Sequence, residues 1–311
     1  MIDRITISIP NCGSRVDPQS FTKLKITRPG MYWEGRIEGN HIYLKQDYDR
    51  LVITANLPKI LNGENVTNLS RKQVDISCGL LEGFLGLDLG RAAVLSIEVG
   101  VSVITKETPG KYISLFADHP YLTRAHYRKA GKDESILYFS KTGGYSFTSY
   151  DKTAEVNSSK KPMPIPPIFQ DQNILRLEYK IKKGLGIRAQ FGKDLYLHDL
   201  HDPEVYGKLK TLFHEAYLQV PKTGREVFLN GEGMILPSDF DKACAMQFRQ
   251  LFPEDCQTFL LAAKTQNLLT DDNYKRVREL FRQDNNGIVR SVSADLVAEL
   301  DSRVADWVRT G

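Results

Sequence analysis

Three segments of the sequence each carry, on the predicted polar face of a β-strand, a side chain suited to cutting a phosphodiester. The first offers Glu98, the second offers Tyr150 with Lys152, and the third offers Glu178 with Lys180. If the three strands are neighbours in one sheet, two carboxylates, a phenol and an amine converge.

These groups match the needs of a DNA-nicking reaction. Two carboxylates a short distance apart bind a hard divalent cation such as Mg²⁺ or Mn²⁺, which prefers oxygen ligands. A cation held by Glu98 and Glu178 would act as a Lewis acid on a phosphodiester while the Tyr150 oxygen attacks phosphorus. Lys152, two residues further along the same face, would lower the pKa of the phenol or neutralise charge that develops on phosphate. The pattern therefore indicates a covalent phosphotyrosine site.

A purely structural interpretation of the same residues stays open. A glutamate on the polar face of a half-buried strand is commonly exposed to solvent, and tyrosine is a favoured strand residue that occurs 14 times in this chain. Spacing alone does not choose between the two interpretations, because it leaves the adjacency of the strands unknown.

The strands that must position these groups are predicted from alternating apolar and polar residues. Strict alternation over 94–104 and again over 175–182 predicts two strands with the glutamates on their polar faces. Between them, residues 136–152 predict a hairpin that turns at a Gly-Gly pair. The first 60 residues alternate short apolar runs with turn residues, which predicts further hairpins.

Beyond about residue 200 the apolar spacing becomes helical, in segments such as VYGKLKTLFHEAYLQV, DFDKACAMQFRQLF and SADLVAELDSRVADWVR. The predicted fold class is α+β, with an antiparallel-sheet catalytic core, a β-rich N-terminal region and a helical C-terminal region. The predicted boundaries are 1–75 for the β-rich region, 76–220 for the catalytic nicking core and 221–311 for the helical region.

Composition and charge narrow the class of protein. The 311 residues include 42 Lys plus Arg and 38 Asp plus Glu, a formal net charge of +4, which excludes a uniformly cationic nucleic-acid coat. Residues 160–200 alone hold eight basic and four acidic side chains, an excess equal to that of the whole chain. We expect DNA phosphates to lie along this strip. The residues assigned to DNA binding are Arg176, Lys180, Lys182 and Lys183, and for the last two a merely solvated strand face is an equal alternative.

Four scattered cysteines without C-x-x-C spacing indicate neither a zinc ribbon nor a disulfide framework, and they fit a reducing compartment. The opening MIDRITISIP lacks an apolar signal core, and the most apolar stretch, 79–104, is interrupted by four charged residues. We therefore expect a soluble, cytoplasmic protein with no membrane partner.

The chain resembles the filamentous-phage gene II/X replication initiation protein family at four places in the same order. The first is MIDRITISIP, similar to the family's opening MID and short β run. The second is LPKILNGENV at 57–66, which resembles a family stretch containing proline, lysine, leucine, glycine and an Asn-Val pair. The third is LSIEVGVSV at 95–103, where the family has a strand with one acid. The fourth is SYDKTAEV at 149–156 followed by ILRLEYKIKKGL at 174–185, similar to the family's Tyr-x-Lys-x-x-Glu element and Arg-x-Glu strand. The resemblance covers about the first 200 residues.

This resemblance implies a rolling-circle replication initiator, a site-specific single-strand DNA endonuclease and ligase. Such a protein nicks a duplex origin, stays joined to the 5′ phosphate through tyrosine, leaves a 3′-OH for a host DNA polymerase and later rejoins the displaced strand. The resemblance implies Tyr150 as the nucleophile with Lys152 beside it. It implies Glu98, where phage members have Asp, and Glu178 as metal ligands. For Glu155 it leaves metal ligation and a structural partnership with a nearby base as equal alternatives.

Related functions stay open. A relaxase of a mobile element uses the same chemistry, and a non-catalytic origin-binding replication repressor is a rival because the family includes shorter inhibitory products. No Gly-x-x-x-x-Gly-Lys-Ser/Thr phosphate loop occurs, so unwinding would need a host helicase. Tyr138 is the reserve nucleophile. His198 and His201, spaced i, i+3, are favoured as a polar helix start over a metal pair.

Overall fold

The chain forms two compact units in the computed structural model, Met1–Pro221 with Leu300–Gly311, and Lys222–Glu299. The structure describes residues 2–10, 21–27, 30–37, 40–46, 50–117, 119, 121–129, 132–158, 164–222, 227–229, 264–265, 270–282 and 289–310. The predicted helix DFDKACAMQFRQLF lies outside these residues. The predicted division of the chain into 1–75, 76–220 and 221–311 stays a prediction.

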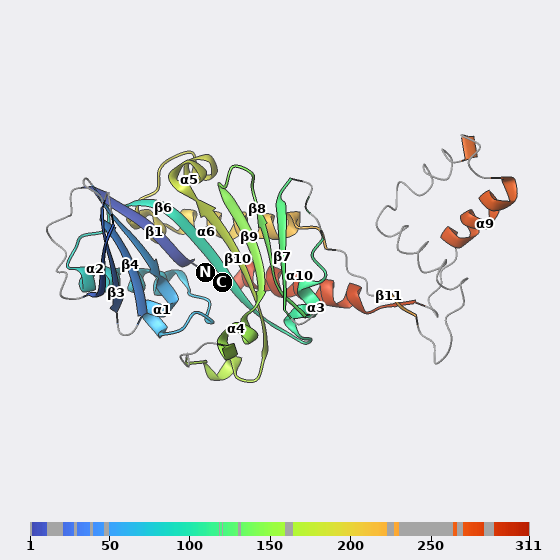
Figure 1. The fold of residues 1–311 in the computed structure, drawn as a ribbon, viewed down its shortest axis with the longest axis horizontal. Coiled ribbons are helices and arrows are strands. Elements are labelled where there is room, and N and C mark those ends of the chain that lie inside the picture. The colour runs from blue at the N-terminus through green and yellow to red at the C-terminus, as the bar shows by residue number, and fades with distance from the viewer. Residues whose placement is uncertain are drawn as a thin grey trace. The chain divides into compact units, whose positions relative to one another are not determined.

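Ten strands of the first unit form one antiparallel sheet in the order β2-β3-β4-β5-β1-β6-β10-β9-β8-β7 (Figure 1). Their bounds are β1 (Ile2–Pro10), β2 (Phe21–Thr27), β3 (Gly30–Ile37), β4 (Asn40–Gln46), β5 (Arg50–Asn56), β6 (Ala93–Thr105), β7 (Thr123–Lys129), β8 (Lys132–Phe139), β9 (Tyr145–Asp151) and β10 (Asn173–Lys182). In the second unit, β11 (Val227–Leu229) pairs with β12 (Val289–Ser291).

The helices gather mostly after the strands in the sequence, which confirms the predicted α+β class. Their bounds are α1 (Leu57–Asn62), α2 (Arg71–Leu85), α3 (Pro109–Ile113), α4 (Lys152–Ser158), α5 (Lys183–Phe191), α6 (Pro203–Gln219), α9 (Asp271–Arg282) and α10 (Val292–Thr310), with short 3₁₀ turns η2 (Pro167–Phe169) and η3 (Leu197–His201). None of the helices in the described part of the chain is long and apolar enough to cross a membrane.

Local sequence signals fix the connection between β5 and β6. The Asn56 side chain accepts a hydrogen bond from the Lys59 N–H and so caps α1, which ends at Gly63 in the left-handed region with φ 75°. Ser70 and Gln73 form a capping box that starts α2. The apolar run after residue 79, which periodicity leaves open between helix and strand, is therefore the C-terminal half of a helix.

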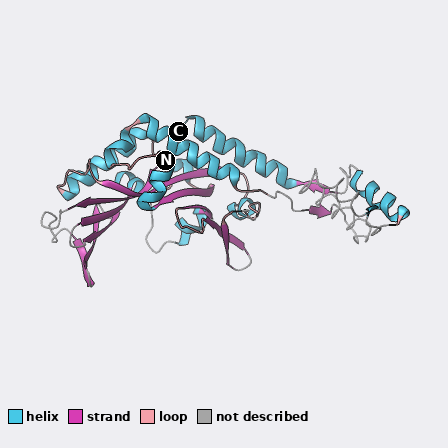
Figure 2. Ribbon diagram, turned by 90° about the horizontal axis from the view of Figure 1, so that it is seen from above, coloured by secondary structure: helices cyan, strands magenta, loops and turns pink. Residues whose placement is uncertain are grey.

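The two faces of the sheet are covered by different elements. On one face, Phe147 of β9 packs against Phe213 and Tyr217 of α6, with ring centroids 6.2 and 6.5 Å apart. Figure 2 shows the long helices gathered along one side of the strands. On the opposite face, Ile174 of β10 packs with Val66 and with Val156 of α4. On β6 itself, the polar-face residues Glu98 and Ser102 are 6% and 8% exposed, so this face is buried and not a solvent-facing surface.

Candidate active site

Strand order and register bring the three chemical segments together. β10 lies between β6 and β9, with Glu178 opposite Gly100 on one side and opposite Thr148 on the other. Lys180 lies opposite Glu98. Tyr150 lies opposite Arg176, and its Oη donates a hydrogen bond to Glu178 Oε1 at 2.9 Å. Glu98, Tyr150 and Glu178 thus share one face of three adjacent strands.

A third carboxylate, Asp3, joins this face because of an irregularity in β1. Ile2 pairs with Val99 and Arg4 pairs with Glu98, so one extra residue stands in β1 between two successive pairs. Such a β-bulge re-aims a side chain relative to the regular alternation. The sequence carries a sign of it, since the apolar residues of this strand are two apart from Ile5 onward but three apart at its start.

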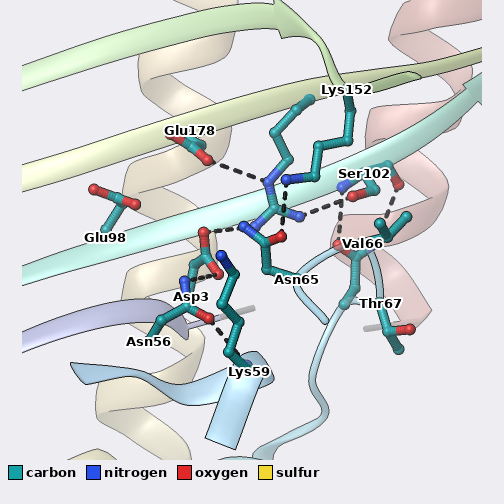
Figure 3. Close-up of polar contacts among 12 residues, drawn as sticks. Asp3, Asn56, Lys59, Asn65, Val66, Thr67, Glu98, Ser102, Lys152 and Glu178 are labelled. Carbon is teal, nitrogen blue, oxygen red and sulfur yellow. Dashed lines mark hydrogen bonds and ion pairs between the residues drawn. The ribbon is translucent and has the colours of Figure 1, made fainter. Parts of the chain in front are cut away.

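Asp3, Glu98 and Glu178 form a compact acidic cluster (Figure 3). Each offers a carboxylate oxygen, and these atoms all lie within 4.8 Å of one another. Asp3 and Glu98 are buried at 2% and 6% exposure. The Asn56 side chain donates to Asp3 Oδ1 at 3.1 Å, so the residue that caps α1 also orients a member of the cluster.

Lys180 and Arg176 form ion pairs with the three acids. Lys180 Nζ lies 3.0 Å from Glu98 Oε2, and Arg176 contacts both Asp3 and Glu178. Burial raises the pKa of Glu178 to about 7, with the nearby Glu98 adding to the effect and Arg176 opposing it. Three carboxylate oxygens this close together fit a hard divalent cation.

Arg176 is buried and holds the cluster together. Its Nη2 lies 2.9 Å from Asp3 Oδ2, its Nη1 donates to Ser102 Oγ at 2.8 Å, and its Nε lies 3.4 Å from Glu178 Oε1. Burial opposes the charged form, yet the facing acids raise the pKa of Arg176 above its ordinary value. The guanidinium lies against Gly100, where a Cβ would overlap it. Only glycine leaves room for this arrangement.

The phenol of Tyr150 is held in its protonated form. Burial raises its pKa well above 10, and the charge of Glu178 adds to this, while Arg176 opposes it. The net shift is upward because burial and the acids outweigh the opposing effect of Arg176, and the expected role of Lys152 toward the phenol stays a prediction.

Lys152 lies beside Tyr150, and its ammonium pairs with groups outside the Asp3, Glu98 and Glu178 cluster. It is fully buried, and its Nζ donates to Asn65 Oδ1 at 2.9 Å and to Glu155 Oε2 at 2.8 Å. The ammonium stands 5.7 Å from the centre of the Tyr150 ring. Burial lowers the pKa of Lys152, and Glu155 opposes the effect. Glu155 is therefore the ion-pair partner of this lysine, while the acidic cluster takes Asp3 as its third member.

The loop between α1 and α2 presents Asn65 to Lys152. The Glu64 side chain is buried and accepts hydrogen bonds from the backbone N–H groups of Val66 and Thr67. Sequence reasoning assigned no role to Asp3, Asn56, Glu64 or Asn65, although Asn65 and Glu64 lie within LPKILNGENV. Glu64 bonds to the backbone of its own turn, and the Asn65 amide accepts from Lys152, which is distant in the sequence. Neither contact produces a periodic pattern in the sequence.

The four residues assigned to DNA binding occupy different environments. Arg176 is 1% exposed and fully engaged, so it cannot meet an external phosphate in this structure. The Lys180 side chain is 29% exposed while paired with Glu98, and Lys182 is partly exposed. Lys183 begins α5, and its side chain lies outside the described residues.

The remaining alternatives lie away from the cluster. Tyr138 pairs with Phe147 across the hairpin, which places it on the opposite face from Tyr150, and its Oη donates to the Ala117 carbonyl at 2.6 Å. His198 Nδ1 lies 2.7 Å from the Gly90 carbonyl, and His201 pairs with Asp75. Both histidines lie in the 3₁₀ turn η3 and have structural partners outside it.

The comparisons with known proteins find similarity among solved structures. No family model and no curated protein matches the sequence. Among solved structures, the fold is similar to a rolling circle replication initiator protein from Geobacillus stearothermophilus, with 10% sequence identity, a TM-score of 0.37, and coverage of 76% of this chain and 89% of that chain.

Proposed function

We propose that the chain is a metal-dependent, tyrosine-using DNA-nicking enzyme that initiates rolling-circle replication. The observation that carries the proposal is the 2.9 Å hydrogen bond from Tyr150 Oη to Glu178, a member of a cluster whose three carboxylate ligand atoms lie within 4.8 Å. A phenol next to an acidic cation site is the pair of groups that covalent phosphodiester cleavage requires. The resemblance to the gene II/X family supports replication initiation as the setting.

Asp3, Glu98 and Glu178 would hold the cation. Their all-oxygen donor set favours Mg²⁺ or Mn²⁺ over a softer metal. When bound, the cation would polarise the scissile phosphate and offset its negative charge. Arg176 and Asn56 keep the carboxylates in place through the contacts described above, so the site is ordered by its own side chains.

In the cleavage step, Tyr150 Oη forms a bond to phosphorus while the bond from phosphorus to the 3′ oxygen breaks. The phenol proton passes along the existing hydrogen bond from Tyr150 Oη to Glu178 Oε1. The departing 3′ oxygen takes a proton from water. Ligation reverses these bonds: a 3′-OH attacks the phosphotyrosine and gives its proton to the solvent, and Glu178 returns the other proton to the phenol oxygen.

The buried Lys152 would stabilise the position of the Tyr150 ring and not the charge on phosphate. Its Nζ is engaged with Asn65 and Glu155 and is fully buried. Lys180 and Lys182, at the exposed end of β10, would contact the DNA backbone, and Lys183 is retained as a further contact at the start of α5. Origin DNA would be the partner, with a host helicase for unwinding and a host DNA polymerase extending the 3′-OH.

A supercoiled replicon that encodes the chain is the substrate for the test. Incubation with Mg²⁺ or Mn²⁺ is expected to give relaxed circles carrying protein on the 5′ end, which protease digestion releases. EDTA and Tyr150→Phe are expected to abolish both products. Tyr121→Phe serves as the matched control, because Tyr121 is 81% exposed and lies outside the site.

The outcome separates the rival functions. Absence of relaxation and of adduct on every supercoil tested would overturn the proposal. Strong, salt-sensitive origin binding that ignores EDTA and Tyr150→Phe would indicate a replication repressor. Nicking followed by transfer of the strand to a recipient, without replication, would indicate a relaxase.

A further inference from the structure

Beyond the acids and the tyrosine, the face that carries Tyr150 continues across β8 to the edge strand β7 (Figure 1). Ser135 pairs with Tyr150, and Tyr127 pairs with Ser135, so Tyr127 stands in the same row as the proposed nucleophile. Adjacent strands are about 4.8 Å apart, which puts the Tyr127 and Tyr150 backbones ~10 Å from each other.

A second row leads from the basic end of β10 to an aromatic residue. Phe139 of β8 pairs with Ser146 of β9, and Ser146 pairs with Lys180. Between the two rows lie Leu137 and Ala125, which pair with each other and stand on the same face. We name Ala125, Tyr127, Leu137 and Phe139 the β7–β8 platform.

The platform remains accessible although its side chains are largely apolar. Tyr127 is 57% exposed, and Ala125, Leu137 and Phe139 keep intermediate exposure. On the reverse face of the same strand, Ile136 and Tyr138 are completely buried. Apolar surface of this kind, continuous with a candidate active site, points to a ligand with apolar faces.

We propose that the β7–β8 platform binds the bases of single-stranded DNA next to the scissile phosphate. The inference rests on the proposed nicking function and adds the surface that holds the strand. Every base has a flat π-face that stacks on an aromatic side chain, while the basic residues that follow the backbone supply charge. The platform offers Tyr127 and Phe139 at its two ends, with Lys180 in the Phe139 row.

The spacing suits more than one base. Phe139 lies four residues along β8 from Ser135, the partner of Tyr127, which corresponds to ~13 Å along the strand. Leu137 fills the interval between the two rings. A strand crossing this surface would place its bases on the platform and its phosphates toward β9 and β10, where Tyr150 and Lys180 lie.

The test compares a fluorescent oligo-dT with an abasic oligonucleotide of equal length, at one salt concentration and in EDTA. Tyr127→Leu and Phe139→Leu keep apolar surface but remove the π-face. Each is expected to weaken oligo-dT binding by about 5- to 150-fold, the scale of one lost base–aromatic stack, and to leave abasic binding unchanged. Tyr196→Leu is the control, since Tyr196 is 40% exposed but bridges to Ala93 and stacks on His198. Urea unfolding of each variant verifies that it folds.

The results separate this inference from the nicking proposal because the binding assay involves no cleavage. Equal losses for both oligonucleotides, unchanged oligo-dT binding, or a wild type without preference for bases would overturn the platform. If the platform variants differ from wild type in sedimentation coefficient but not in DNA affinity, the surface serves self-association, and this result would also overturn base binding by the platform. A wild type that stacks bases but never nicks would refute the proposed function alone.

Discussion

The polar face of β10 contains two halves with opposite environments. At one end Arg176 is 1% exposed and engaged by Asp3, Glu178 and Ser102. At the other end Lys180 and Lys182 keep contact with solvent. All three residues occupy polar positions of the same alternating pattern, so their difference in exposure comes from the segments that pack over them. The loop that carries Asn65 and helix α4 reach the first end, where Val66 and Val156 pack on Ile174.

This difference teaches that a basic strip in a sequence is not one functional unit. The buried half organises negative charge, because a desolvated guanidinium is stable only among acids. The exposed half is free to exchange solvent for phosphate. The buried half should therefore control chemistry and stability, and the exposed half should control affinity and its salt dependence.

The largest expected effect is on nicking by Tyr150, which lies opposite Arg176 at the buried end of β10. Tyr150→Phe removes the proposed nucleophile, and we expect nicking to fall by on the order of 10⁴-fold or more, the scale seen when an essential catalytic group is lost. DNA binding should change little, because one hydrogen bond to Glu178 is all that the described contacts lose. Adduct formation on a denaturing gel is the measurement. A covalent adduct that persists in Tyr150→Phe and disappears in Tyr138→Phe would contradict the assignment.

The next effect is on stability. Arg176→Met leaves Asp3 and Glu178 without their buried cation, and we expect the free energy of unfolding in urea to fall by about 3–5 kcal/mol. Gly100→Ala should also destabilise, because its Cβ overlaps the guanidinium. In the double variant the losses in the free energy of unfolding should be less than additive. The flexible methionine side chain can move away from the added Cβ, whereas the ion-paired arginine cannot.

Lys182→Met is the matched control on the exposed half, where we expect a change within about 0.5 kcal/mol. Equal losses for Arg176→Met and Lys182→Met would remove the distinction between the two halves.

A smaller effect concerns pH. The pKa of Glu178 is raised from 4.5 to about 7 in the folded protein, so the folded state holds this proton more tightly than the unfolded state does. Its contribution to stability is thus present below about pH 4.5 and is lost as pH rises through about 7. In EDTA, we expect the free energy of unfolding in urea to fall more for wild type than for Glu178→Gln between about pH 5 and about pH 8.

Added Mg²⁺ should reverse that loss in wild type at the higher pH, because a bound cation favours the ionised carboxylate. Glu178→Gln should show less of this rescue. A wild type whose stability rises over the same window relative to the variant would contradict the burial-driven shift.

The smallest effect is on the exposed half. Lys182→Gln should reduce the slope of log affinity for single-stranded DNA against log salt by about 0.7, as expected for one lost phosphate contact, and Lys180→Gln should reduce it by less. The change should be larger for Lys182, because Lys180 is already paired with Glu98. Slopes that remain at the wild-type value in both variants would show that this half does not meet DNA.

Much of the fold was predictable because its signals are local. Alternation over β6, β9 and β10 predicts the face on which Glu98, Tyr150 and Glu178 lie, and the register agrees. The hairpin of β8 and β9 also follows from its turn, where Gly143 adopts φ 69°. These features depend on near neighbours in the sequence, and period two alone separates one face of a strand from the other.

The sequence by itself thus determined which side chains share a face, where the chain turns, and that acids, a phenol and amines lie on strands of one protein. Only the tertiary structure decided which strands adjoin, which half of the shared face is covered, and that Asp3 takes the third position through a bulge in β1. The physical reason is that alternation specifies direction relative to a strand, whereas burial and charge pairing depend on segments distant in the chain. Arg176 shows this most directly, because its partners Asp3 and Ser102 lie far from it in the sequence.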